Sequence, residues 1–237
     1  MCQSSLGAVV LVSRPNIPKP LAVKGVIFDM DGTLADSVEY FYSISLEVLD
    51  IAGVPRPSRD RVFELMRVGD DNPLAKLFPA DYPDPAATIK RIVDDRMDAW
   101  MDHYHHKTQA LPGSLALIKD LHAKGFLLGI ATSSGRALPY LDHWGVRQLF
   151  SGIVGREDVE NRKPNPEPIL KCLDHLGLQP QDVVYVGDSP IDVHASKAAG
   201  SYTVGVLTGT SDRATMEQHG PDYILDSVAQ LSEILCV

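Results

Sequence analysis

The sequence predicts an α/β fold, in which a Rossmann-like parallel-sheet core carries an inserted all-helical cap. Three observations support this prediction. Short apolar runs end repeatedly in polar residues, helical periodicities lie between these runs, and one long segment contains helical patterns alone. Apolar strands that alternate with helices are typical of βαβ units, whose parallel sheet is covered by helices on both faces.

Three apolar runs are expected to be buried strands of this sheet. They lie at 24–28, 126–131 and 183–187, and each leads directly into polar residues at 29–32, 132–135 and 188–190. Because the carboxyl ends of parallel strands meet at one edge of a sheet, we expect these polar residues to converge on one crevice. Helical periodicities follow at 114–124, 136–144, 166–176 and 191–199.

The segment 37–110 breaks this alternation. It holds amphipathic stretches near 38–52, 59–67 and 86–105, bounded by an acidic turn on one side and by Leu111-Pro112-Gly113 on the other. We therefore expect residues 37–110 to form a helical cap, and residues 23–36 and 111–237 to form the core. Residues 1–22, with three prolines, are expected to be a flexible leader.

Composition narrows the possible functions. A net charge of -9 argues against nucleic acid or an anionic membrane as a general partner. The apolar run 6–12 is too short to span a bilayer, and no basic residue precedes it as a secretory signal requires. Cys2, Cys172 and Cys236 form neither a CxxC pair nor an even set, which favours a reducing compartment. We expect a cytoplasmic protein that is a monomer or a homodimer.

The stretch "VIFDMDGTL" places Asp29 and Asp31 at the end of a strand. Met30 between them points the other way along the extended chain, so both acids face one side. Together with Asp188 they would repel one another, and a divalent cation with oxygen ligands, usually Mg²⁺, relieves that repulsion. Backbone N–H groups at Gly32 and at Ser133 would suit a phosphoryl ligand at the same place.

Four motifs then make the sequence resemble the haloacid dehalogenase superfamily of phosphohydrolases. They are Asp29-Met30-Asp31-Gly32-Thr33, Thr132 after an apolar strand, Lys163-Pro164, and the run from Gly187 to Asp192. They occur in the family's order across residues 24 to 206, with the helical insert where the family's cap belongs. Singly, each residue has a structural alternative: an acid or hydroxyl can cap a helix, and a lysine can be solvated.

The resemblance implies a role for each matched residue. Asp29 would be the nucleophile that forms an aspartyl-phosphate, and Asp31 the general acid and base. Thr132 and Lys163 would contact the phosphoryl group, with Gly32 and Ser133 also at the phosphate site. Asp29, Asp31 and Asp188 would hold Mg²⁺, with Asp31 contributing its backbone carbonyl, and Asp192 would orient this shell.

Two other features are less specific. Arg67, in a polar turn between cap helices, could contact an anionic substrate, although a plain solvated turn fits equally well. His103, His105 and His106 invite a metal site, but their spacing near the end of a predicted helix does not bring all three together. We expect a surface or helix-end role for this histidine group.

The resemblance favours a Mg²⁺-dependent phosphatase that hydrolyses a small phosphorylated metabolite, either a phosphoglycolate-like acid or a sugar phosphate. Asp31 argues against a dehalogenase, which needs no acid at that position. A beta-phosphoglucomutase-like mutase is an alternative, but Phe41 stands where such enzymes carry a histidine. A non-catalytic binding protein of the same fold is a further alternative.

Overall fold

The computed structural model describes residues 10–11, 20–68, 72–133 and 137–236. Its strands form one sheet in the order β1-β7-β6-β5-β2-β3-β4, and all neighbours are parallel except β1 and β7. This arrangement confirms the expected α/β fold with a Rossmann-like parallel sheet. The strands are β1 (Val10–Leu11), β2 (Gly25–Phe28), β3 (Leu127–Ala131), β4 (Gly152–Val154), β5 (Val183–Gly187), β6 (Tyr202–Val206) and β7 (Tyr223–Leu225).

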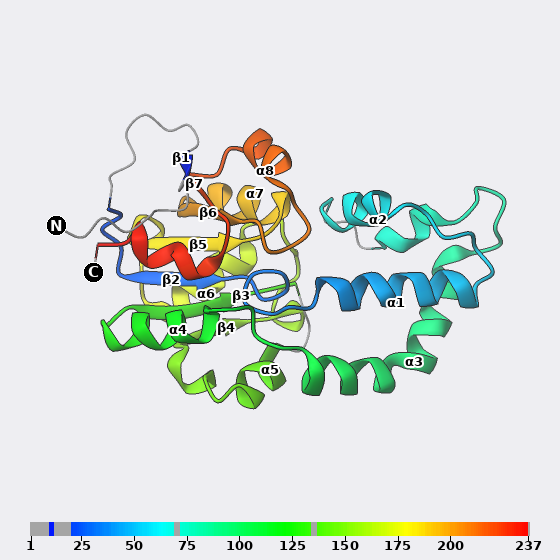
Figure 1. The fold of residues 1–237 in the computed structure, drawn as a ribbon, viewed down its shortest axis with the longest axis horizontal. Coiled ribbons are helices and arrows are strands. Elements are labelled where there is room, and N and C mark those ends of the chain that lie inside the picture. The colour runs from blue at the N-terminus through cyan, green and yellow to red at the C-terminus, as the bar shows by residue number, and fades with distance from the viewer. Residues whose placement is uncertain (1–9, 12–19, 69–71, 134–136, 237) are drawn as a thin grey trace.

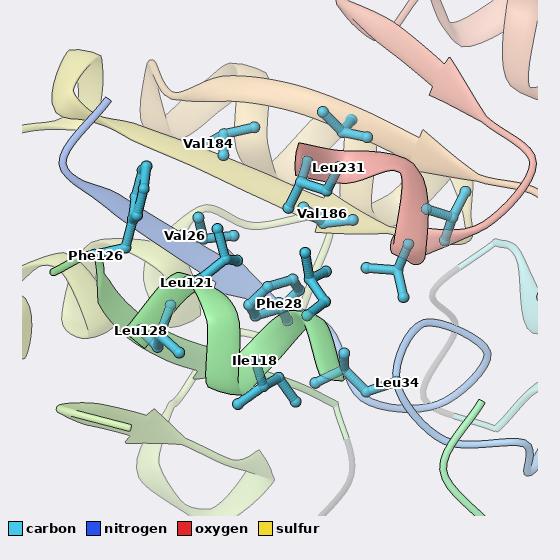
Figure 2. Packing of buried hydrophobic residues seen from close by; sticks show 14 of the residues in the cluster. Val26, Phe28, Leu34, Ile118, Leu121, Phe126, Leu128, Val184, Val186 and Leu231 are labelled. Atoms are coloured by element: carbon cyan, nitrogen blue, oxygen red, sulfur yellow. The ribbon is translucent and has the colours of Figure 1, made fainter. Parts of the chain in front are cut away.

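Side chains of β2 alternate between the two covered faces of the sheet. Val26 and Phe28 pack in a cluster with Ile118 and Leu121 of α4, as Figure 2 shows, whereas Ile27 packs on the opposite face among residues of α6. This period-two alternation explains why the whole strand is apolar, since both of its faces are buried.

Helices cover both faces and build a separate group beside the core (Figure 1). The α-helices are α1 (Val38–Ile51), α2 (Arg59–Met66), α3 (Pro85–Lys107), α4 (Ser114–Ala123), α5 (Ala137–His143), α6 (Glu167–Leu176), α7 (Pro190–Ala199) and α8 (Arg213–His219). The 3-10 helices are η1 (Pro73–Leu77), η2 (Arg147–Leu149), η3 (Arg156–Asp158), η4 (Pro180–Asp182) and η5 (Val228–Glu233).

The cap helices, which are α1, α2, η1 and α3, lie together on one side of the core in Figure 1. Helices α1, η1 and α3 enclose an apolar cluster of their own, which includes Val48, Leu49, Ile92 and Trp100. The chain enters and leaves this group at one place, because Ala35 pairs antiparallel with Ala110. Backbone hydrogen bonds flank this pair, from Asp36 N to Gln109 O (2.9 Å) and from Leu111 N to Leu34 O (2.8 Å).

Several elements were not expected from the sequence. Strands β4 and β7 have three residues each, which is too short for a recognisable apolar run, and in β6 the polar Thr203 interrupts the run. Within the stretch expected to be a leader, Val10–Leu11 pairs with β7, and Leu21 is buried in the main apolar cluster. Among the described helices, none combines the length and the apolar character needed to cross a membrane.

Candidate active site

Three neighbouring strands deliver polar side chains to one edge of the sheet. Asp29 follows β2, Thr132 follows β3 and Asp188 follows β5, and β2 lies between the other two strands. The backbones of Asp29 and Thr132 remain hydrogen-bonded to the neighbouring strands, since Asp29 N donates to Val186 O (2.8 Å) and Thr132 N to Val154 O (3.0 Å). All three side chains, with Asp31, Ser133, Lys163 and Asp192, line one pocket of about 680 Å³.

Lys163 connects two of these acids from the loop that precedes α6. Its Nζ donates to Asp29 Oδ1 (2.7 Å), to Asp192 Oδ1 (2.6 Å) and to the hydroxyl of Tyr185 (2.9 Å). The three protons of the ammonium group therefore each have an acceptor, which a buried charge requires. Tyr185 was missed by the sequence reasoning; its one signal is a hydroxyl inside an otherwise apolar strand.

Asp192 lies in the first turn of α7 and is fully engaged by protein donors. Its Oδ2 accepts from Ser189 Oγ (2.5 Å) and from Ser189 N (3.2 Å), while its Oδ1 accepts from Lys163. Glycine at 187 makes room for this carboxylate, because a Cβ there would lie 2.3 Å from Asp192 Cγ. Asp192 is thus placed to hold Lys163 in position.

A loop after β6 supports Asp188 and was also missed. Thr210 donates to Asp188 Oδ2 from its backbone N (2.7 Å) and from Oγ1 (3.0 Å), and Thr208 Oγ1 donates to Gly32 O (2.7 Å). Gly209 lets the loop approach closely, since a Cβ there would lie 2.0 Å from Asp188 Oδ2. In the sequence these residues are only a run of small polar residues after an apolar stretch.

Asp31 lies on the tight turn that follows Asp29. Its Oδ1 accepts from Ser37 Oγ (2.6 Å), and Met30 between the two acids is buried in the core, as its alternation with them predicts. Gly32 has a φ of 75°, a conformation that favours glycine, and its backbone lies beside Asp188 and Gly209. The turn therefore directs both acids of the pair toward the pocket.

The acids are held in an environment that disfavours their charge. Burial raises the pKa of Asp29 to about 8; Lys163 opposes this rise, and Asp192 and Asp188 add to it. Burial also raises the pKa of Asp188 to about 7, with Asp192 adding to the rise. Burial alone would lower the pKa of Lys163, but Asp192 and Asp29 raise it above its ordinary value.

The carboxylates of the site carry more negative charge than Lys163 can offset, and this excess suits a bound metal ion. Oxygens of Asp29, Asp188 and Asp192 lie within 4.8 Å of one another, and Lys163 is the single ammonium group hydrogen-bonded to any of them among the described residues. Asp192 is occupied by protein donors, which leaves Asp29 and Asp188 as the better ligands. Closely spaced hard oxygen donors with excess negative charge fit Mg²⁺.

Arg67 and the histidine group were the two less specific features of the sequence. Arg67, at the end of α2, donates from Nε to Thr210 O (2.7 Å), and it is not among the residues that line the pocket. The backbone of His103, His105 and His106 belongs to α3, but their side chains lie outside the part of the structure that is described.

Strand-end acids, a threonine and a buried lysine meet at one crevice of a parallel sheet, an arrangement suited to an enzyme that transfers phosphoryl groups. The chain belongs to the haloacid dehalogenase-like hydrolase family, whose sequence model matches residues 26–206. This result confirms the resemblance that the motifs indicated.

Individual relatives agree with this family. The chain is 30% identical to the phosphoglycolate phosphatase of Salmonella typhimurium over 229 residues, covering 88% of this chain and 91% of that protein. It is 30% identical to the pyrophosphatase PpaX of Halalkalibacterium halodurans over 221 residues, covering 92% and 99%. A Bacteroides fragilis structure described as a haloacid dehalogenase-like hydrolase matches with a TM-score of 0.77 and 27% identity, covering 88% and 99%. The comparisons confirm the expected enzyme class, a phosphatase of this family.

Proposed function

We propose that this protein is a Mg²⁺-dependent phosphatase that hydrolyses a small phosphorylated metabolite through an aspartyl-phosphate on Asp29. One observation carries the proposal: Asp29, Lys163 and Asp192 form a buried hydrogen-bonded group beside Asp188 at the base of a pocket. Burying several carboxylates beside a single lysine costs free energy, and a bound cation would offset that cost.

In the first half of the reaction, a carboxylate oxygen of Asp29 attacks phosphorus and the bond from phosphorus to the ester oxygen breaks. Lys163, 2.7 Å from Asp29 Oδ1, fixes the orientation of the nucleophile and favours its ionised form. Asp31 gives its proton to the departing oxygen, so the organic group leaves as an alcohol.

In the second half, Asp31 takes a proton from a water molecule as that water attacks phosphorus. The bond between phosphorus and the Asp29 oxygen then breaks, which releases inorganic phosphate and restores both carboxyl groups. Asp31 is suited to this exchange because it is only half buried, lines the pocket, and is held by the hydroxyl of Ser37.

Phosphate and metal would be held by the residues around this pair. Thr132 and Ser133 line the pocket, and with the backbone of Gly32 and the charge of Lys163 they would bind phosphoryl oxygens. Asp29, Asp188 and the backbone carbonyl of Asp31 would bind Mg²⁺. When bound, the ion would offset the negative charge of the carboxylates and of the phosphoryl group.

The experiment measures p-nitrophenyl phosphate hydrolysis with Mg²⁺ and after EDTA treatment. We expect turnover that EDTA abolishes and that added Mg²⁺ restores. Asp29→Asn should show no turnover, because the nucleophile is lost. Asp31→Asn should release one equivalent of p-nitrophenolate in a burst and then slow by roughly 10²–10⁴-fold, because this leaving group needs no proton but the water does.

Asp120→Asn serves as the matched control, since Asp120 is exposed and pairs only with Lys124 (2.8 Å) in the contacts described. It should retain wild-type turnover. Turnover that survives Asp29→Asn would contradict the covalent route. Phosphosugar isomerisation without phosphate release would instead support a mutase, although Phe41, which lines the pocket, offers no acid or base for the second transfer.

A further inference from the structure

The pocket has two chemically different walls. Its polar lining comes from the core, where the strand ends lie. The opposite wall comes from the cap helices, and side chains from all four of them reach it. Representative residues of this cap wall are Phe41 and Ile44 of α1, Met66 of α2, Leu74 of η1, and Met97 and Met101 of α3.

These cap-wall side chains are half-buried, which distinguishes them from the closed core of the cap. Ile44 and Leu74 pack on one side against that core, which includes Val48, Leu49, Ile92 and Trp100. Phe41 and Met101 pack in the same way against the main core cluster, and all four also line the pocket with the surface that remains exposed. Leaving apolar surface in water costs about 25 cal/mol per Å². A concave apolar wall opposite a polar cluster is the usual anatomy of a small-molecule site.

The part of the cap wall that the structure describes offers few groups that would bind a polar organic portion. Ser45 is the one polar residue that the described cap helices contribute to the lining, and its Oγ already donates to Phe41 O (2.9 Å). The cations among the described lining residues, Lys163 and Arg156, both come from the core, and the proposed function assigns Lys163 to the phosphoryl group.

A carboxylate or several sugar hydroxyls placed against the described cap helices would lose water without gaining hydrogen-bond partners from them, which is unfavourable. Met66, Met97 and Met101 give this wall a flexible apolar surface that adapts to different hydrocarbon shapes.

We infer that the substrate is a phosphate monoester whose organic group is apolar, either alkyl or aryl. This inference rests on the proposed function and narrows it, because the phosphate would bind at the strand ends while the hydrocarbon contacts the cap wall. It disfavours phosphoglycolate-like acids and sugar phosphates, which remain the prediction from the sequence.

The test compares kcat/KM for n-propyl, n-butyl and n-hexyl phosphate with 2-phosphoglycolate and glucose 6-phosphate, all at saturating Mg²⁺. These esters all have primary alcohol oxygens as leaving groups, so differences report mainly on the organic portion. We expect kcat/KM to rise with chain length, by up to about fourfold per buried methylene. Hexyl phosphate should exceed both polar esters by at least tenfold.

Acetyl phosphate separates this inference from the proposed function, since it is small enough to react without reaching the cap wall. If acetyl phosphate and every ester fail to react, the proposed function is wrong. If acetyl phosphate reacts but the alkyl series is flat, or a polar ester reacts fastest, only the inference about the apolar substrate is overturned.

A cap-wall variant gives a second readout. Met97→Lys places a cation on the wall and should lower kcat/KM for hexyl phosphate while raising it for 2-phosphoglycolate. Met97→Leu is the matched control, because it keeps the wall apolar and should preserve the order of the substrates. An unchanged order in a folded Met97→Lys protein would contradict the inference, and the wild-type series decides the matter if that variant does not fold.

Discussion

Arg67 of the cap contacts Thr210 of the core. The guanidinium group donates from Nε to Thr210 O (2.7 Å) and also from Nη2, and Thr210 N donates in turn to Asp188 Oδ2 (2.7 Å). A side chain at the end of α2 is therefore joined, through one residue, to a carboxylate expected to hold the metal ion. This contact therefore links the position of α2 to that of Asp188.

Replacing Arg67 should weaken that link. Arg67→Gln loses the charge-assisted hydrogen bonds to Thr210, and we expect kcat/KM for p-nitrophenyl phosphate to fall about five- to tenfold. Arg61→Gln is the control, since Arg61 lies on the same helix and pairs with exposed Glu64. The loss of kcat/KM should be similar for phosphate esters whose organic group is charged and for those whose organic group is uncharged. A loss confined to 2-phosphoglycolate would instead support the prediction that Arg67 binds a substrate anion.

A methyl group at position 209 should disturb the metal site. The Cβ of alanine there would lie 2.0 Å from Asp188 Oδ2, so the carboxylate or the loop must move. We expect Gly209→Ala to raise the Mg²⁺ concentration for half-maximal activity at least tenfold. Gly205→Ala is the control, because its Cβ would meet the flexible side chain of Met216 instead. An equal change in both variants would show a general loss of stability rather than a local effect on Asp188.

The stability of the loop that carries Lys163 should depend on the charge of Glu167. Backbone N–H groups of Glu160 and Asn161 donate to its carboxylate, and with Lys171 they lower the pKa of Glu167 to about 2. Because the folded-state pKa lies below the ordinary value, this stabilisation is present above about pH 4.5 and is lost as pH falls toward 2.

Glu167→Gln should therefore melt at a lower temperature than wild type at pH 6, and the difference should shrink in melts recorded at pH 3. Turnover at pH 7 should also fall a few-fold, because the loop that positions Lys163 is held less firmly. Glu64→Gln, which removes an exposed pair, is the comparison. A melting difference that is the same at both pH values would refute this account of Glu167.

Sequence reasoning succeeded where the signal is local. The strand that ends at Phe28 is apolar because both of its faces are buried, and acids directly after such a strand have few structural reasons to be there. The pairing of these acids and their convergence with Thr132 and Asp188 follow from the geometry of a parallel sheet, so the pocket's polar base could be predicted.

What could not be predicted depends on contacts between distant segments. Thr210 supports Asp188 because β6 lies beside β5 in the sheet, and Arg67 reaches Thr210 across 143 positions of sequence. Thr210 has no local pattern that marks it, and the polar turn that drew attention to Arg67 suggested a substrate anion rather than Thr210 as its partner. The apolar cap wall was hidden for a different reason: Phe41 or Met97 in an amphipathic helix looks the same whether it faces a closed core or a cavity.

The pairing of Ala35 with Ala110 has an evolutionary consequence. The segment that carries the cap helices leaves and re-enters the core at two residues that lie side by side in space. It could therefore be lengthened, shortened or exchanged without changing the order or the connections of the strands in the sheet. The acids and the lysine would stay in place through such an exchange, since they belong to the other part of the chain. Selection can thus change which molecules are accepted independently of the chemistry performed on them.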